Sequence, residues 1–499
     1  MRLTRTRAIA QTFFLALFLW LLYKADFSRM ESYPVSLFLE IDPLLALGTA
    51  LATHTLYAGM LLSLLVLIPT IFLGRFFCGW VCPFGALHTF FSRLFRPLKR
   101  AEQVEADRYR PIYALKYYIL AAFLILAAFG VTQVGLLDPM ALLTRSMATA
   151  VFPAVGAATG GRILGTWTFH LAWLLGGILI LLLLLNAVLP RFFCRVLCPL
   201  GALLGVFSRF SLFRVHKNSE KCNECEQCLV NCHGAADPHG TLRKSECYVC
   251  LECRGSCPTG VITFQVLPPE EEVRVAPEVS RRRLLQTGAV TLAAVPLLGA
   301  SVRPDRRPPP DLIRPPGSRE ESRFLGSCIK CGACMLVCPT NVIQPLMFQA
   351  GLEALWTPVM DYQLGYCEHN CTLCTEVCPT GAIRELSVEE KMGEDPYETP
   401  ISLGTAFLDR SRCLPWAMYK PCIVCEEVCP VSPKAIYIEE AEGLDAEGHR
   451  VALQRPVVEP ARCIGCGLCE YKCPVYDKRA IRVSSVGESR SPTNVLLLE

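Results

Sequence analysis

Long apolar runs separated by short charged segments dominate the first 300 residues. Five of these runs, at 8–23, 51–77, 113–134, 166–189 and 284–302, approach the roughly 20 residues that an α-helix needs to cross a bilayer. The pattern predicts an α-helical membrane bundle of four spans, followed by a fifth span. With 52% hydrophobic residues, the whole chain is also more apolar than a soluble protein of its length.

Basic residues predict the orientation of the bundle. The connections on one side of the bundle carry few basic residues, and acidic residues accompany Arg29 and Arg162 there. By the positive-inside rule, the N-terminus and the basic connections are expected in the cytoplasm of a bacterial cell, with the chain in the inner membrane. The clustered basic residues are Arg2, Arg5, Arg7, Arg93, Arg96, Lys99, Arg100, Arg108, Arg110, Arg209, Arg214 and Lys217.

An internal repeat indicates that two spans are one unit used twice. Residues 75–93 and 191–209 share the frame R-F-F-C-x3-C-P-x-G-A-L and end in F-S-R. A second echo, I-D-P-L at 41–44 and L-D-P-M at 137–140, lies on the expected outer side. Parallel repeats of this kind bring equivalent positions together about an axis along the membrane normal.

The 28 cysteines form six quartets and two C-x3-C-P pairs. Two quartets follow the fourth run with the C-x2-C-x2-C-x3-C spacing of [4Fe-4S] ferredoxins, in which the fourth cysteine usually binds the other cluster. A zinc site needs only two C-x2-C pairs, so six quartets favour clusters. We therefore expect one cluster on Cys222, Cys225, Cys228 and Cys257, and another on Cys247, Cys250, Cys253 and Cys232.

The C-terminal third carries four more quartets, in which the first gap of the middle two is lengthened. Each ends in C-P followed by a short apolar pair, typical of the small strand that covers a cluster in ferredoxin folds. Six [4Fe-4S] clusters are therefore expected, in two α+β ferredoxin-like domains. The quartets are Cys328, Cys331, Cys334 and Cys338; Cys367, Cys371, Cys374 and Cys378; Cys413, Cys422, Cys425 and Cys429; and Cys463, Cys466, Cys469 and Cys473.

The fifth run begins with S-R-R-R-L-L-Q at 280–286, which is similar to a twin-arginine export signal. An ordinary stop-transfer helix with anchoring arginines is the alternative, and both send the following segment outward. The expected organisation is a four-span domain (1–215), a cytoplasmic two-cluster domain (216–270), the fifth span (280–303), a Pro-rich linker (304–322) and a periplasmic four-cluster domain (323–499).

These motifs resemble two proteins of the periplasmic nitrate reductase system. The duplicated C-x3-C-P segments and the first two quartets are similar to the membrane ferredoxin subunit NapH, and residues 280–499 to the polyferredoxins NapG and MauM. A fusion of the two implies a quinol dehydrogenase that passes electrons from the membrane quinol pool, such as menaquinol, to a periplasmic reductase or cytochrome within a larger membrane complex. Nucleic acid is not an expected partner. In related four-cluster subunits, the outer two quartets exchange fourth ligands with each other, and so do the inner two.

The four C-x3-C-P thiols, Cys78, Cys82, Cys194 and Cys198, are expected to meet at the cytoplasmic face of the bundle. They are candidates for a further metal centre or a redox dithiol pair. Buried cysteines that merely pack beside proline breaks are the alternative.

Quinol oxidation needs proton acceptors, and intramembrane ionisable groups are the default candidates. Asp42, Asp138, His54 and His170 are the candidates near the outer ends of spans. The two aspartates could equally well be helix N-caps before proline. For the two histidines, a shared haem is a weaker alternative. Trp80, Phe84 and His88 are candidates for a quinol pocket on the cytoplasmic side.

The sequence thus predicts a membrane wire in which quinol is oxidised and a soluble partner is reduced. Two other hypotheses stay open. One is a redox-sensing or maturation protein, and the other is reverse flow, in which soluble ferredoxin drives quinone reduction.

Overall fold

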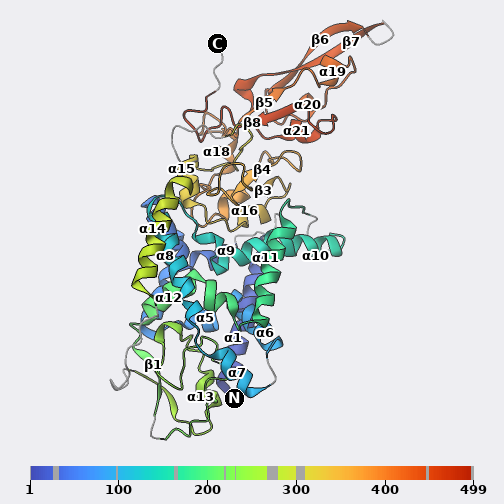
Figure 1. Ribbon diagram of the computed structural model, residues 1–499. Helices are drawn as coiled ribbons and strands as arrows, with labels where there is room; N and C mark the ends of the chain where they lie inside the picture. Colours follow the sequence, from blue (N-terminus) through green and yellow to red (C-terminus); the bar gives the residue numbers. More distant parts are fainter. Residues whose placement is uncertain are drawn as a thin grey trace.

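The computed structural model describes residues 2–25, 33–96, 99–161, 167–218, 221–230, 232–266, 279–298, 309–444 and 449–495. Arg29 and Arg162, on which part of the orientation prediction rested, lie outside these ranges. The helical bundle occupies the middle of the molecule, with small cysteine-rich domains at its two ends (Figure 1). We call these the two-quartet domain (213–266) and the four-quartet domain (309–495).

The bundle is built from twelve α-helices among its described residues, several of them short. Their bounds are α1 Arg2–Lys24, α2 Leu37–Glu40, α3 Pro43–Thr53, α4 Leu64–Leu73, α5 Phe76–Trp80, α6 Pro83–Leu94, α7 Arg100–Asp107, α8 Leu115–Ala128, α9 Pro139–Ser146, α10 Phe152–Ala158, α11 Ala172–Leu184 and α12 Pro199–Ser208. A 3-10 turn, η1 (Ala58–Ser63), precedes α4, and a π-helical turn, η4 (Met147–Val151), joins α9 to α10.

Three helical stretches of the described residues are long and apolar enough to cross a membrane: Thr4–Lys24, Arg100–Ala128 and Pro139–Ala158. The first and second correspond to predicted spans. The third was expected to be part of an outer connection, and the structure forms it as a helix that starts at Pro139 after its N-cap Asp138. Its place as an outer connection stays a prediction. Buried Arg145, within an otherwise apolar segment, was the sequence signal for a special role of this helix.

Two other predicted spans differ from the structure. The run at 51–77 is not one helix, because α3 ends at Thr53 and α4 stops at Gly74, whose φ of 87° favours glycine. Pro69 lies within α4. In the run at 166–189, the α-helix begins only at Ala172. The duplicated unit is therefore a set of short, broken helices instead of two long ones.

The helix α14 (Arg281–Leu298) corresponds to the predicted fifth span and packs along α8. Ser280 N donates to Tyr118 Oη at 3.0 Å, and a Cβ on Gly288 would lie 3.9 Å from Ile125 Cδ1, so the two helices run in the same direction. The start of α8 contacts the two-quartet domain, and Thr132, just after its end, contacts the four-quartet domain. The helix α14 thus leads from one domain toward the other.

The two-quartet domain has one antiparallel pair of strands, β1 (Phe213–Lys217) and β2 (Ile262–Val266), and the short helix α13 (Glu252–Ser256). Its contacts with the bundle are polar and buried. Glu246 accepts hydrogen bonds from Lys116, Tyr117 (2.8 Å) and Arg75 (3.4 Å), and Arg7 of α1 pairs with Glu252 at 2.5 Å. Paired in this way, the charges avoid the cost of isolated burial.

The four-quartet domain is made of three antiparallel strand pairs and several one-turn helices. The chain forms α15 Glu321–Ser327, α16 Ala333–Leu336, β3 Ile343–Pro345, β4 Pro358–Met360, α17 Leu373–Glu376, α18 Val388–Met392, β5 Thr405–Leu408, α19 Leu414–Ala417, α20 Val424–Glu427, β6 Ile436–Leu444, β7 Arg450–Val458, α21 Leu468–Lys472 and β8 Ile481–Ser484. The pairs are β3–β4, β5–β8 and β6–β7. The β6–β7 hairpin forms the tip farthest from the bundle (Figure 1).

The predicted linker is partly wrong. Residues 304–308 lie outside the described ranges, but from residue 309 the chain packs into the four-quartet domain. Leu312, Ile313 and Arg314 are buried, and Arg314 donates to Thr357 Oγ1 and Pro358 O. Proline richness suggested an extended spacer, but these residues find partners across the domain.

One hydrophobic core runs from the bundle into the four-quartet domain, and their backbones touch at one point. A Cβ built on Gly135 would lie 1.8 Å from Ile329 O. Nearby, Thr132 Oγ1 donates to Gly326 O, and Arg145 Nη1 donates to Lys330 O at 2.8 Å. The domain is therefore seated on the bundle by close backbone contact, which requires glycine.

We predict that Gly135→Ala loosens this seat. Overpacking costs about 1–3 kcal/mol, so amide exchange in residues 326–331 should quicken about tenfold or more in hydrogen–deuterium exchange of the full chain. Gly177→Ala is the matched control, because a Cβ there meets nothing within 4 Å. Equal exchange in the two variants would contradict the seating.

Candidate functional site

The thiols of the two-quartet domain gather in two sets, as predicted. Set 2, which is Cys232 with Cys247, Cys250 and Cys253, lines one small cavity. In set 1, Cys222 and Cys257 are the thiols nearest Cys228, and Cys225 lies on the same loop. The fourth cysteine of each quartet thus lies with the other quartet.

In the four-quartet domain the thiols form four sets, which we number outward from the bundle. Three of the sets line small cavities, and in the remaining one Cys378 neighbours the first three cysteines of the domain. Set 3 is Cys328, Cys331, Cys334 and Cys378; set 4 is Cys338, Cys367, Cys371 and Cys374; set 5 is Cys429, Cys463, Cys466 and Cys469; and set 6 is Cys413, Cys422, Cys425 and Cys473.

This grouping corrects the expected pairing. Quartets adjacent in sequence exchange their fourth cysteines, whereas the resemblance implied exchange between the outer two and between the inner two. The physical reason is local. The β3–β4 pair folds the segment between the first two quartets back on itself, and the β6–β7 pair does the same between the last two. The β5–β8 pair then joins the segments before and after these last two quartets.

The four sets form a row. Sets 3 and 4 are joined by the exchange of Cys338 and Cys378, and sets 5 and 6 by the exchange of Cys429 and Cys473. Between sets 4 and 5, Cys367 N donates to Cys466 O at 2.8 Å. Tyr362 Oη donates to Gly465 O at 2.6 Å beside this junction. The row leads from the seat on the bundle toward the β6–β7 tip.

The chemistry of these sets suits iron–sulfur clusters better than single metal ions. Around one zinc ion, with Zn–S bonds of about 2.3 Å, four thiolates lie about 4 Å apart. Among the described residues, no three His, Cys, Asp or Glu side chains come together closely enough to hold one metal ion. Four thiols around a small cavity are the arrangement expected for a cubane.

Burial keeps the most enclosed of these thiols protonated when they hold no metal. It raises the pKa of Cys331 and of Cys466 to about 12. Iron binds the thiolate, so assembly of a cluster must displace these protons, and low pH works against it. Thiols of this kind are poor nucleophiles, which argues against thiol catalysis at these positions.

Asp42 and Asp138 are fully buried, and the repeat brings them together as predicted. Each caps a helix that starts with proline. Asp42 Oδ1 accepts from the amides of Leu44 (2.8 Å) and Leu45 (3.3 Å), and Asp138 Oδ1 accepts from the next two non-proline amides of α9 at 2.9 Å. The two carboxyl groups contact each other. The N-cap reading is therefore confirmed, and the contact adds a pair that can hold one proton between two carboxyls.

Arg145 connects this carboxyl pair to set 3. Arg145, two turns along α9 from Asp138, donates to Lys330 O, and Lys330 lies between Cys328 and Cys331. The face of Arg145 lies 4.3 Å from the Trp356 ring. Arg145 and Lys330 were missed by the sequence analysis.

The other candidates are placed elsewhere. His54 is an exposed C-cap of α3, and His170 is exposed and pairs with Asp361 at 2.8 Å, so neither joins the buried carboxyl pair. Phe84 and His88 are buried in an aromatic cluster with Phe193. A quinol site at these four residues stays a prediction.

Trp80 also has another partner. Its Nε1 donates to Val249 O of the two-quartet domain at 3.0 Å. It belongs to the interface between the bundle and that domain.

The C-x3-C-P thiols lie where the two repeated segments contact each other. Cys82 Sγ accepts from Gly85 N and Cys198 Sγ from Gly201 N, both at 3.2 Å, so each caps the following helix. Arg191 of the second repeat donates to Gly85 O of the first at 2.8 Å.

Tyr248 of the two-quartet domain fits between the two repeats. The guanidinium groups of Arg75 and Arg191 lie 4.7 and 4.9 Å from its ring. Its hydroxyl donates to Cys194 O at 3.3 Å. The residue that follows Cys247 of set 2 thus reaches the C-x3-C-P pairs.

Two protein-family profiles match the chain. One described as "4Fe-4S binding domain" covers 55–102 and 169–218, which contain the C-x3-C-P pairs. Another, "4Fe-4S dicluster domain", covers 327–382. The dicluster match contains the same two quartets whose fourth cysteines are exchanged between sets 3 and 4.

The methylamine utilization ferredoxin-type protein MauM of Methylorubrum extorquens is 34% identical over 41% of this chain and 88% of its own length. The chain belongs to the family of ferredoxin-type proteins that includes MauM. It is also similar to the regulatory protein NosR of Pseudomonas aeruginosa, with 32% identity over 40% of this chain but only 28% of NosR. The putative electron transport protein YccM of Escherichia coli is 28% identical over 47% of this chain and 63% of YccM.

These comparisons and the cysteine sets make this chain an iron–sulfur electron-transfer protein. Its membership in the ferredoxin-type family agrees with the predicted class. No solved structure matches the chain.

The exchanged pairing predicts which double variants cost one cluster. Cys338→Ala with Cys371→Ala should remove about four iron atoms, because both thiols belong to set 4. Cys338→Ala with Cys463→Ala should remove about eight, because sets 4 and 5 each lose a ligand. Iron analysis and Mössbauer spectra of anaerobically purified protein measure both losses. The pairing of outer with outer quartets predicts the reverse, so that result would refute the grouping.

Proposed function

We propose that this chain oxidises quinol, such as menaquinol, at the outer end of its bundle and delivers the electrons to a periplasmic acceptor. A nitrate reductase or a cytochrome is the class of acceptor we have in mind. The observation that carries the proposal is the buried Asp42–Asp138 carboxyl pair, which Arg145 connects to the loop of Cys328 and Cys331 in set 3. Quinol oxidation releases protons and electrons together, and this layer offers a proton acceptor beside an electron acceptor.

The 24 cysteines of sets 1 to 6 are the proposed ligands of six [4Fe-4S] clusters. Such clusters, when bound, accept and pass single electrons. The row of sets 3 to 6 then supports outward transfer, because no gap in the packed domain separates one set from the next. The exposed tip beside set 6 is the natural place for a soluble partner to dock.

The chain's own residues would handle the protons. Asp42 and Asp138 each keep one oxygen on helix amides, which fixes the other oxygen toward its partner. A proton taken up by the pair is then shared between the two oxygens. Arg145 holds the loop of Cys328 and Cys331 against this layer through Lys330 O, and the core around it excludes water.

We place the N-terminus and the two-quartet domain in the cytoplasm and the four-quartet domain in the periplasm, across a bacterial inner membrane. Arg5 and Arg7 lie at the end of α1 that meets the two-quartet domain, as positive-inside orientation requires. The helix α14, with its twin-arginine-like start at Arg281, would then cross outward. We propose five spans, four within the bundle and α14 as the fifth.

Sets 1 and 2 lie at the opposite end of the bundle from set 3. The helix α8 between them has 14 residues, about 21 Å. The C-x3-C-P thiols, near set 2, are candidates for a redox relay on that side. This separation favours a second candidate function, in which sets 1 and 2 sense the redox state or support maturation. The similarity to NosR, a regulatory protein, favours it too.

Asp138→Asn and Asp42→Asn should each slow the reduction of the set 3 to 6 clusters by menaquinol at least tenfold. Asparagine is as good an N-cap as aspartate, so the helices should persist while the proton acceptor is lost. Stopped-flow absorbance with EPR of the full chain in detergent measures the rate.

Asp361→Asn, a partly buried carboxylate that pairs with exposed His170, is the matched control and should reduce at the normal rate. Reduction by dithionite and the iron content should be unchanged in all three variants. If menaquinol fails to reduce the wild-type clusters, the quinol function is wrong and the redox-sensing function is favoured. Normal rates in both buried variants would remove the carboxyl pair from the mechanism.

A further inference from the structure

A polar cavity of about 300 Å³ opens on the four-quartet domain, away from the thiol sets themselves. Four segments distant in sequence surround it: the segment first predicted to be a linker, the segment after the second quartet, the segment before β5 and the C-terminal tail. Nothing in the proposed electron route uses it. Its lining includes Arg314, Ser318, Arg323, Arg384, Glu488 and Arg490.

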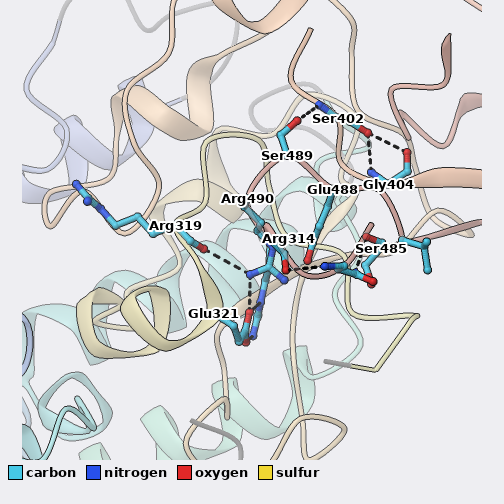
Figure 2. Close-up of polar contacts among 12 residues, drawn as sticks. Arg314, Arg319, Glu321, Ser402, Gly404, Ser485, Glu488, Ser489 and Arg490 are labelled. Atoms are coloured by element: carbon cyan, nitrogen blue, oxygen red, sulfur yellow. Dashed lines mark hydrogen bonds and ion pairs between the residues drawn. The ribbon is translucent and has the colours of Figure 1, made fainter. Parts of the chain in front are cut away.

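The floor of the cavity is a fixed ion-pair network (Figure 2). Glu321 accepts from Arg314 at 2.6 Å and from Arg490 at 2.7 Å, and Arg490 Nε donates to Glu488 at 2.6 Å. The two arginines hold the pKa of Glu321 at about 2 despite its burial. Because these side chains are locked together, the cavity keeps its shape without a ligand.

Positive charge exceeds negative charge around the cavity. Five arginines line it, against the lining carboxylates of Glu320 and Glu488 and those of Glu321 and Glu390, which pair with lining arginines from behind. Arg384 is half exposed at the mouth and pairs with Glu390 at 2.6 Å, and Arg323 is exposed. Arginine forks suit oxyanions, and a concave basic surface concentrates them.

Three buried polar atoms of the lining have no hydrogen-bond partner among the described residues: Ser318 Oγ, Arg490 Nη2 and Glu488 Oε1. The Arg490 side chain is 8% exposed. A buried donor without a partner costs about 1–3 kcal/mol. The Ser318 hydroxyl and the Arg490 N–H therefore each need a hydrogen-bond acceptor.

The cavity lies between the loops of two thiol sets. On one side, Arg319 N donates to Ala382 O at 3.1 Å, and Ile383 N donates to Cys378 Sγ of set 3 at 3.4 Å. On the other, Leu403 N donates to Ile464 O at 2.9 Å, next to Cys463 of set 5. A charge in the cavity therefore acts on both sets, and cluster potentials respond to nearby charge and hydrogen bonding.

We propose that this cavity is a binding site for a small oxyanion of the phosphate or sulfate class, and that its occupation lowers the reduction potentials of the clusters in sets 3 and 5. The binding itself stands apart from the proposed function. Only the effect on potential rests on the cluster assignments made there.

Isothermal calorimetry of the full chain, in detergent and chloride buffer, with inorganic phosphate as the probe tests the binding. Wild type should show saturable heat with one site. Arg384→Gln and Ser318→Ala should each weaken binding about tenfold, because each removes one donor to the anion. Glu488→Gln should bind at least as tightly as wild type, because it removes a negative charge and keeps the shape.

Arg450→Gln, an equal change on the exposed β7 strand, is the control and should bind like wild type. No saturable heat in wild type, or equal affinities in Arg384→Gln and Arg450→Gln, would overturn the site.

An EPR-monitored redox titration with and without phosphate tests the proposed effect on the reduction potentials. Lower potentials of sets 3 and 5 in wild type but not in Arg384→Gln support it, whereas unchanged potentials with normal binding refute the tuning alone. Neither measurement uses quinol, so failure of the quinol function would be seen separately.

Discussion

Two copies of one membrane unit must bury their polar groups against each other, and the rest of the structure depends on this constraint. Each copy brings an aspartate cap, an arginine and a cysteine cap into an apolar bundle, where an unpartnered polar group is costly. The copies meet about a common axis, so Asp42 finds Asp138, and Arg191 finds the carbonyl of Gly85. Neither copy alone offers these partners.

The same constraint prepares both ends of the bundle for docking. At one end, Arg75 and Arg191 enclose Tyr248, and Glu246 satisfies Lys116. At the other, Arg145 and Gly135 receive the loop of the first quartet in the four-quartet domain. Polar groups that cannot be satisfied within the bundle are thus satisfied by the domains it carries. This explains why a cysteine-rich domain seats directly on each end.

Within the four-quartet domain, short-range folding decides how the cysteines are shared. Hairpins form between segments close in the chain, because closing a short loop costs less entropy than closing a long one. Adjacent quartets therefore exchange their fourth cysteines, and the two exchanged pairs meet at Cys367 and Cys466. The result is a row of thiol sets that begins at the carboxyl pair and ends at an exposed tip.

Cysteine spacing alone was enough to predict the six quartets, the exchange between sets 1 and 2, and the iron–sulfur class. The duplicated frame was enough to predict that Asp42 would approach Asp138. Spacing along the chain could not decide the pairing of the last four quartets, the helix at Pro139–Ala158 or the packing of Arg314 into the domain. The pairing depends on which intervening segments fold back on themselves, as β3–β4 and β6–β7 do, and cysteine spacing carries no information on that folding. The other features depend on contacts between segments far apart in sequence, which local patterns leave undetermined. The arginine cavity belongs with them, because four separate segments supply its walls and only their packing brings the charges together.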